Sequence, residues 1–74
     1  NEARLYCGDA NLWFYGNREA DLWVAGGIAD EAADLKLELP GRTVMIRQFL
    51  YGLIRIESGE VILDTNPEAS AEVI

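Results

Sequence analysis

The sequence predicts a small all-β domain, an antiparallel barrel or sandwich of about seven short strands. Three observations lead to this fold class. Segments rich in aromatic and branched residues recur along the chain, glycine-containing turn signals separate them, and apolar and polar residues alternate within several of them. With 74 residues, of which 50% are hydrophobic, the chain has the size and composition of one folded domain rather than of a disordered segment.

An internal repeat in the first third of the chain predicts the first strands. Ala10–Gly16 recurs ten residues later as Ala20–Gly26, and a shortened copy, Ala3–Gly8, precedes both. Each copy ends at a glycine, which can adopt the positive φ angles of tight hairpin turns. The predicted joints are Gly8-Asp9, Gly16-Asn17 and Gly26-Gly27. We therefore expect an N-terminal three-stranded antiparallel meander over residues 2–25.

The middle of the chain changes character before it returns to a strand pattern. Ile28–Asp34 is rich in alanine and acidic residues and predicts either an acidic loop or one or two helical turns. At most one short helix is therefore expected in the domain. Strands are predicted over residues 35–39 and 42–49, joined by a type II turn at Pro40-Gly41.

The last part of the chain predicts a second hairpin followed by a tail. Strands are expected over residues 53–57 and 60–64, and Ser58-Gly59 is the turn that joins them. From Thr65 onward the chain contains Pro67 and small polar residues, which indicates a flexible C-terminal segment. The predicted organisation is a single β domain over residues 1–64 and a flexible tail over residues 65–74.

Alternation predicts which side chains share a face, because successive side chains of a strand point to opposite sides of a sheet. One face of the meander carries Ala3, Leu5, Cys7, Leu12, Phe14, Trp23 and Ala25. The opposite face carries Tyr6, Trp13, Tyr15, Leu22 and Val24, together with Arg4, Asn11 and Arg18. In the later hairpins the apolar residues, with Met45 as the exception, keep to one face, formed by Leu35, Leu37, Val44, Ile46, Ile54, Ile56, Val61 and Leu63. A single sheet with one solvated side does not carry two apolar faces, so the second face of the meander needs an explanation.

Two interpretations account for this second apolar face. The tail or residues 28–34 fold back and cover it, or it is a contact surface. Tyrosine, tryptophan and arginine dominate interface energetics, and contiguous exposed apolar patches are uncommon on monomers. We predict an interface for self-association formed by Arg4, Tyr6, Trp13, Tyr15, Arg18, Leu22 and Val24.

Charge and the missing histidine exclude several functions. The net charge of −7 repels nucleic acids, which bind proteins largely through neutralised phosphates, so nucleic-acid binding is not expected. The simplest interpretation of this charge is solubility, and the alternative is an acidic surface for a basic partner. Without histidine the chain contains no imidazole metal ligand and no Ser-His-Asp triad. With Cys7 as the single cysteine it contains neither an intrachain disulfide nor a thiolate zinc cluster.

No residue pattern nominates a catalytic or metal site. Asp30, Glu31 and Asp34 lack the spacing and the glycine of a calcium loop, and Cys7 has the context of a buried thiol. We expect no enzyme activity, cofactor or metal. Since no disulfide, glycosylation sequon or membrane-length apolar run is present, a cytoplasmic location is expected. Asn1 is not a start methionine, so we expect a processed chain.

Part of the second half resembles a known family. Val44–Phe49, Ile54–Ile56 and Gly59–Thr65 are similar to the C-terminal strands of tryptophan-sensing RNA-binding attenuation proteins. The resemblance covers about a third of the chain and implies an all-β protein that assembles into a ring. The family's Gly- and Thr-rich ligand loop is missing, and Glu57 stands where a basic RNA-contacting residue is wanted. No site residue is therefore transferred.

The sequence leaves three functional hypotheses. The first is a non-enzymatic protein-interaction module that self-associates through the aromatic sheet face. The second is a small β-barrel that binds a planar ligand or single-stranded nucleic acid on the same rings, including as a ring oligomer. The third is an acidic mimic that binds a basic protein partner.

Overall fold

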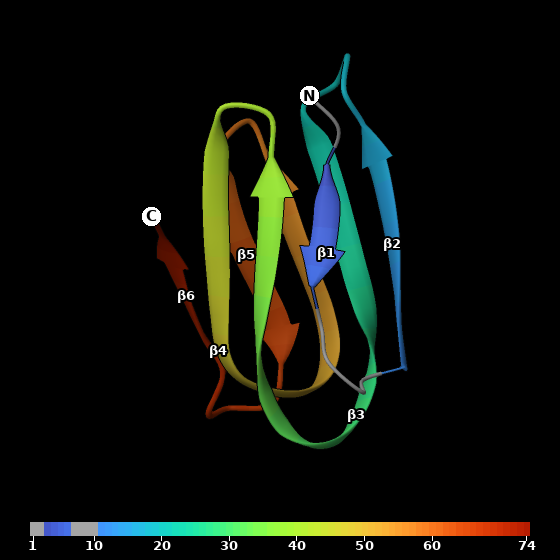
Figure 1. The fold of residues 1–74 in the computed structure, drawn as a ribbon, viewed down its shortest axis with the longest axis vertical. Helices are drawn as coiled ribbons and strands as arrows, with labels where there is room; N and C mark the ends of the chain where they lie inside the picture. The colour runs from blue at the N-terminus through green and yellow to red at the C-terminus, as the bar shows by residue number, and fades with distance from the viewer. Residues whose placement is uncertain (1–2, 7–10) are drawn as a thin grey trace.

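Six antiparallel strands make up the fold, and the computed structural model describes them over residues 3–6 and 11–74 (Figure 1). The predicted all-β class is confirmed, and the described residues contain no helix. The strands are β1 (Arg4–Tyr6), β2 (Asn11–Asn17), β3 (Leu22–Leu39), β4 (Arg42–Glu57), β5 (Glu60–Thr65) and β6 (Ser70–Val73). Six strands replace the seven expected, because β3 and β4 are 18 and 16 residues long.

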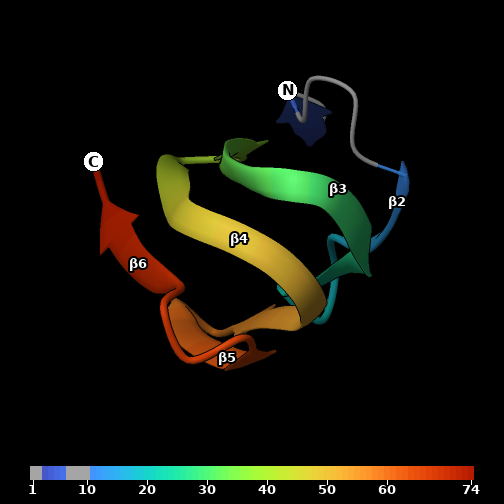
Figure 2. The same ribbon diagram turned by 90° about the horizontal axis from the view of Figure 1, so that it is seen from below.

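The two long strands take part in two layers of one folded sheet. Residues 22–28 of β3 and 52–57 of β4 form a first layer with β2 and β5. Residues 35–39 of β3 and 42–47 of β4 form a second layer with β1 and β6. Both strands curve at the same end of the molecule, so the sheet folds over on itself (Figures 1 and 2). The result is a β-sandwich and not a closed barrel. Among the described residues, β1 and β2 pair with β3 alone and β5 and β6 pair with β4 alone, so no pairing joins the edge strands and closes the sheet.

Irregular backbone allows the strands to bend between the layers. The pairing of β3 with β4 shifts register between Ile28 and Ala33 and again between Ala33 and Leu35. Gln48 lies in the left-handed region with φ of 59°, and bulges of this kind bend a strand. The backbone N–H of Gln48 donates to the carboxylate of Asp34 at 3.2 Å. The bend is therefore held by a side chain of the neighbouring strand.

Asn66 satisfies the backbone of β4 next to this bend. Among the described residues it is the one polar or charged residue that is buried, with 3% of its surface exposed. Its Oδ1 accepts hydrogen bonds from the backbone N–H groups of Leu50 (2.8 Å) and Tyr51 (3.3 Å), and its Nδ2 donates to the carbonyl of Gln48 (2.9 Å). Buried backbone groups that no neighbouring strand pairs need other hydrogen-bond partners, and the side chain of Asn66 supplies them here.

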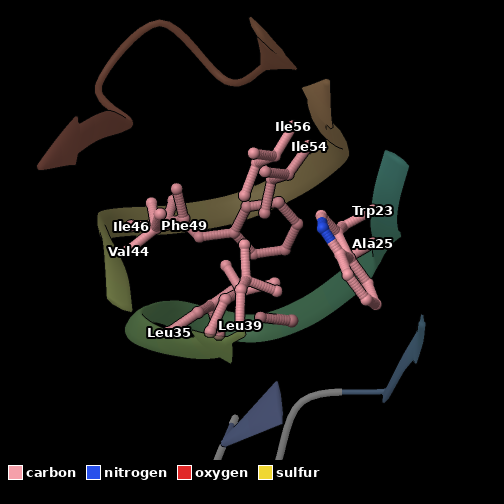
Figure 3. Close-up of a cluster of buried hydrophobic side chains, with 11 residues drawn as sticks. Trp23, Ala25, Leu35, Leu39, Val44, Ile46, Phe49, Ile54 and Ile56 are labelled. Carbon is pink, nitrogen blue, oxygen red and sulfur yellow. The ribbon is translucent and has the colours of Figure 1, made fainter. Parts of the chain in front are cut away.

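The hydrophobic core lies between the two layers (Figure 3). Phe49 is fully buried at its centre, and residues from both layers surround it. The buried core residues are Trp23, Ala25, Ala29, Leu35, Leu37, Leu39, Val44, Ile46, Phe49, Ile54 and Ile56. Ala3, Leu5, Leu12, Phe14, Val61 and Leu63 pack against this cluster from the edge strands. The shared faces predicted from alternation are confirmed for these residues except Ala29, Leu39 and Phe49, which were assigned to no face, while Cys7 lies outside the described residues.

The predicted meander is correct for its second and third segments, which pair as β2 and β3, and wrong for its first segment, β1. β1 pairs with residues 36–38 of β3, and β2 pairs with residues 22–28 of the same strand. β1 and β2 therefore belong to different layers. The physical reason is that β3 is long enough to pair with both strands along one of its edges, with β2 before its bend and β1 after it. The expected turn at Gly8-Asp9 lies outside the described residues.

Two further expectations are corrected by the strand assignments. Ile28–Asp34 forms no helix but continues β3 through the bend, with Ala29 buried and the acidic Asp30, Glu31 and Asp34 exposed. Seven residues are too few to nucleate a stable helix against strand pairing on both sides. The predicted flexible tail contains β6, whose residues Ser70–Val73 pair with residues 44–47 of β4.

Two of the predicted turns are confirmed, and another is wrong. Pro40-Gly41 and Ser58-Gly59 join strands as predicted, and Gly41, Ser58 and Gly59 have the positive φ angles of 82°, 50° and 84°. Gly16-Asn17 is not a turn, because the chain reverses over residues 18–21. A Cβ on Gly16 would lie 2.3 Å from the Trp23 ring, so glycine is required here by packing.

Candidate interaction surface

The outer surface of the first layer collects most of the exposed large apolar side chains. Nine such side chains are exposed in the part of the chain that the structure describes, and six of them lie on this surface. We call it the aromatic face and define it by Trp13, Tyr15, Ile28, Tyr51, Leu53 and Ile62. Their exposed fractions range from 42% to 68%. The face crosses four neighbouring strands, β2, β3, β4 and β5.

Cross-strand register places these side chains in rows. Tyr15 lies opposite Val24, Val24 opposite Arg55, and Arg55 opposite Ile62. Directly opposed residues on one face of an antiparallel sheet have Cβ atoms ~4.5–5.5 Å apart, so their side chains are neighbours. A further pair, Ile28 and Tyr51, lies at the end of the layer nearest the bend. The exposed side chains are therefore neighbours across the whole width of the layer, with Arg55 between Val24 and Ile62.

A glycine lets Trp13 and Leu53 approach each other across β3. Gly26 lies opposite both residues, Trp13 on β2 and Leu53 on β4. A Cβ at Gly26 would lie 2.7 Å from Leu53 Cδ2 and 3.0 Å from Trp13 Cζ2. The two side chains thus occupy the space above Gly26 and bury its backbone. This places a half-exposed indole near the middle of the aromatic face.

The other side of β2 is anchored in the core. The ring of Phe14 stacks on that of Trp23, with centroids 6.4 Å apart and an interplanar angle of 15°. The indole N–H of Trp23 donates to Asp21 Oδ1 at 3.0 Å, and Arg42 pairs with Asp21 at 3.2 Å. These contacts, led by the bond from Trp23, hold the pKa of Asp21 below its usual value. Core packing therefore fixes the direction in which Trp13 and Tyr15 point outward.

Carboxylates lie along one side of the aromatic face, whereas Arg55 lies between its apolar side chains. Arg55 forms an ion pair with Glu57 of the same strand. Glu57 lies opposite Glu60, and Asp64 lies opposite Leu53. The two glutamates and the aspartate follow the β5 side, whereas β2 contributes Asn11 and Asn17 at its ends. The face therefore has one acidic side and one uncharged side, and its apolar side chains enclose a single paired cation, Arg55.

The predicted interface residues do not all come together. Trp13, Tyr15, Leu22 and Val24 share the outer surface of the first layer, and Leu22 lies opposite Asn17 and Glu57. Arg18 lies exposed in the turn between β2 and β3. Arg4 and Tyr6 lie on β1 in the second layer, because β1 pairs with the other half of β3.

Tyr6 belongs to a polar surface on the second layer. Its hydroxyl donates to Glu38 Oε1 at 3.2 Å, and Lys36 Nζ lies 5.9 Å from its ring centroid. Lys36 also pairs with Glu38 at 3.3 Å. On the same side, Arg47 pairs with Asp34 at 3.0 Å and with Glu72 at 3.3 Å. The exposed tyrosine of this layer is thus surrounded by paired charges, unlike those of the aromatic face.

Sequence reasoning missed Ile28, Tyr51, Leu53 and Ile62 as members of the surface. Leu53 and Ile62 alternate with the inward Ile54 and Val61 in their strands, so the sequence indicates that both point outward. It does not indicate which residues lie beside them, since the pairing of β4 with β3 joins residues about 30 positions apart. Ile28 was assigned to a helix or loop, which removed it from any sheet face.

Elsewhere in the described chain the acidic groups serve local structure. The N–H of Gln48 and then the Arg47 guanidinium hold the pKa of Asp34 below its usual value. The side-chain amide of Asn66 likewise lowers the pKa of Glu68. Residues 3–6 and 11–74 contain no group of three or more potential ligands that could hold a metal ion. None of their elements is a helix long and apolar enough to span a membrane.

Comparison of the chain with protein-family models, with curated proteins and with solved structures finds no match to any of them. The similarity of residues 44–65 to attenuation proteins therefore has no family match behind it. The aromatic face must be interpreted from its own geometry.

Proposed function

We propose that the chain is a non-enzymatic, cytoplasmic protein-interaction module that self-associates through the aromatic face. The observation that supports this most directly is the concentration of six exposed large apolar side chains on one sheet surface. Contiguous apolar patches of this kind on soluble domains mark interaction sites. Two faces of this type can pack as sheets do in a sandwich, ~10 Å apart.

The size of the face fits a contact between two copies. If a large side chain exposes ~200 Å² when fully accessible, the observed fractions leave on the order of 600 Å² on these six residues. A standard interface buries ~800 Å² on each partner. Leu22, Val24 and the surrounding polar atoms supply the remaining area. The face is therefore large enough to form a specific dimer without any change of fold.

The charge distribution favours a face-to-face contact in which opposite sides of the two faces overlap. Under a two-fold axis parallel to the strands, the acidic β5 side of one copy lies over the uncharged β2 side of the other. Glu57, Glu60 and Asp64 then stay at the rim, away from their symmetry mates. The centre of the contact is made by Trp13, Tyr15 and Leu53. Such an interface is apolar at the core, so high salt should not dissociate it.

A matched pair of tyrosines tests the proposal. Tyr51 on the aromatic face and Tyr6 on the second layer are both 47% exposed. Tyr51→Ser is expected to weaken self-association by about tenfold, because an interface aromatic is lost. Tyr6→Ser, which removes the same group from the other layer, should leave association unchanged. The measurement is molecular mass by light scattering against protein concentration, at low salt and at high salt.

The proposal is wrong if the two variants associate equally, or if the wild type is a monomer at high concentration. Binding of a planar ligand or of single-stranded nucleic acid to the same rings is the competing function. It has less support, because Arg55, the cation among these side chains, is paired with Glu57. Saturable quenching of tryptophan fluorescence on titration with an oligonucleotide at low salt would favour it. Recovery of basic proteins in a salt-sensitive manner would favour an acidic mimic.

A further inference from the structure

The free edge of β2 is the least protected strand edge of the molecule. In the part of the chain that the structure describes, β3 is the one strand that pairs with β2. β2 therefore lies at the outer margin of the first layer, as Figure 1 shows. Every second residue of an antiparallel edge strand directs its N–H and C=O away from the sheet. Such a row of free backbone groups is a template for pairing with another strand.

The other three edge strands carry the features that protect an edge. β1 has three residues and contains Arg4, and β6 has four residues and contains Glu72. β5 has six residues, with Glu60 and Asp64 near its ends. Short length and charge both discourage pairing with a further strand. β2 is the longest of the four, at seven residues, and contains neither a charged residue nor a proline.

The sequence of β2 is complementary to itself in the antiparallel direction. When two copies pair with Phe14 opposite Phe14, Trp13 lies opposite Tyr15 and Asn11 lies opposite Asn17. Each of these pairs occurs twice because of the two-fold axis. Cross-strand aromatic pairs stabilise sheets, and the aromatic residues are on the outer surface of both copies. The two ends are closed by pairs of amides, which carry no net charge.

The charge of the whole chain points to the same edge. Each copy carries a net charge of −7, so two copies repel each other wherever acidic surfaces meet. β5 and β6 would bring acidic side chains face to face. β2 lets two copies approach without placing any charge within the paired strands. It also offers about six backbone hydrogen bonds that are otherwise made to water.

We propose that two copies of this chain pair through β2, antiparallel and centred on Phe14, so that their first layers join into one continuous eight-stranded sheet. This contact does not require the proposed function, because its hydrogen bonds come from the edge of the layer, although Trp13 and Tyr15 belong to both contacts. Its two-fold axis stands perpendicular to the sheet, whereas that of the face contact lies parallel to it. Because the face contact lays β5 over β2, the two axes do not meet, so both contacts together generate an open row of copies, and each alone generates a dimer.

Charges placed at the two ends of β2 test the register. Asn11 and Asn17 are both exposed. Asn17 Oδ1 accepts a hydrogen bond from the N–H of Ala20 at 3.1 Å, and an aspartate keeps this acceptor. The double variant N11D/N17D places Asp opposite Asp at both ends of the paired strands. The variant N11K/N17D places Lys opposite Asp at both ends.

Sedimentation at low salt over a range of concentrations measures the edge association. We expect N11D/N17D to weaken it by about tenfold, since like charges directly opposite destabilise a strand pair. N11K/N17D should restore it to at least the wild-type level. The control A32D/S70D adds the same two negative charges at exposed positions away from β2 and should leave it unchanged.

The outcome also separates the edge contact from the face contact. If only the edge contact exists, the wild type is a dimer that Tyr51→Ser leaves intact and N11D/N17D dissociates. If both exist, the mass of the wild type rises beyond that of a dimer with concentration, and each of these variants reduces it to a dimer. The edge proposal is overturned if N11D/N17D has the same mass as the wild type, if N11K/N17D does not recover, or if the wild type is a monomer. A dimer that only Tyr51→Ser dissociates overturns it as well, while it supports the face.

Discussion

The outer faces of the two layers come from the same two long strands but carry opposite chemistry. The first layer exposes Trp13, Tyr15, Leu53 and Ile62 with few charges between them. The second layer exposes Lys36, Glu38, Arg47 and Glu72, which form ion pairs around Tyr6 and Met45. A sheet face that stays in water is normally polar, as the second layer is. The first layer lacks that adaptation, which is why it is assigned to contacts between copies.

The difference arises on either side of the bend in β3 and β4. Before the bend, the outward positions of β3 are Leu22, Val24, Gly26 and Ile28. After it, they include Asp34, Lys36 and Glu38. The inward positions on both sides are apolar and form one core. Core formation therefore places the same demand on both layers, and only the outward positions differ between them.

The largest expected effect is loss of the core that both layers share. Phe49→Ala removes the fully buried ring at the centre of the sandwich and should lower the free energy of unfolding by ~3–5 kcal/mol. Phe49→Leu, which keeps most of the volume, is the control and should lower it by about 1 kcal/mol. Urea unfolding followed by circular dichroism measures both. If Phe49→Ala costs no more than Phe49→Leu, the two layers do not depend on a common core.

A smaller effect is expected from a methyl group under the aromatic face. Gly26→Ala forces Trp13 and Leu53 apart and should lower the free energy of unfolding by ~1–3 kcal/mol. It should also increase acrylamide quenching of tryptophan, because Trp13 moves outward while Trp23 stays buried. Quenching must be compared at concentrations where both proteins have the same mass.

Gly41→Ala is the matched control for this substitution. Gly41 has φ of 82°, so alanine is strained there by about 1 kcal/mol, but no atom lies within 4 Å of its Cβ position. Its tryptophan quenching should equal that of the wild type. Equal quenching in Gly26→Ala would show that Trp13 does not rest over Gly26, and the aromatic face would lose its centre.

The smallest effect concerns the polar face and its dependence on pH. Asp34 and Asp21 have lowered pKa values in the folded chain, so their ionised forms stabilise it. This contribution is complete above the unfolded pKa of ~3.9 and is lost as the pH falls through the lower folded value. NMR titration of the side-chain carboxyl carbons should therefore give midpoints below ~3.9 for both residues.

Arg47→Met should raise the midpoint of Asp34 and leave that of Asp21 unchanged. The increase is partial, because the N–H of Gln48 is the first cause of the lowered pKa and stays in place. Lys36→Met, which removes a cation that pairs with Glu38 instead, is the control and should move neither midpoint. If Arg47→Met leaves the titration midpoint of Asp34 unchanged, Arg47 does not form the ion pair with Asp34 in solution.

Alternation along the chain predicted the inward residues well, because burial of one face is a local property of each strand. Leu35, Leu37, Val44 and Ile46 illustrate this, as do Phe14 and Trp23 in the first part. The turns at Pro40-Gly41 and Ser58-Gly59 were predicted for the same reason, since their backbone conformations depend on adjacent residues. The all-β class followed from these local features together.

Which strands become neighbours was decided only in the folded chain. Tyr6 was grouped with Trp13 and Tyr15 by its nearness in sequence, yet β1 pairs with the far half of β3. Leu53 and Ile62 entered the aromatic face only through the pairing of β4 with β3 and β5. Such pairings depend on where two long strands bend, which is set by bulges and by the hydrogen bonds of Asp34 and Asn66.

The sequence by itself therefore determined the class of the fold, the identity of most core residues and the presence of surplus aromatic side chains. The tertiary structure decided how these aromatic side chains are distributed, one in the second layer and three among the side chains of the aromatic face. The physical reason is that side-chain direction follows from a period of two residues, whereas layer membership follows from contacts between residues far apart in the chain.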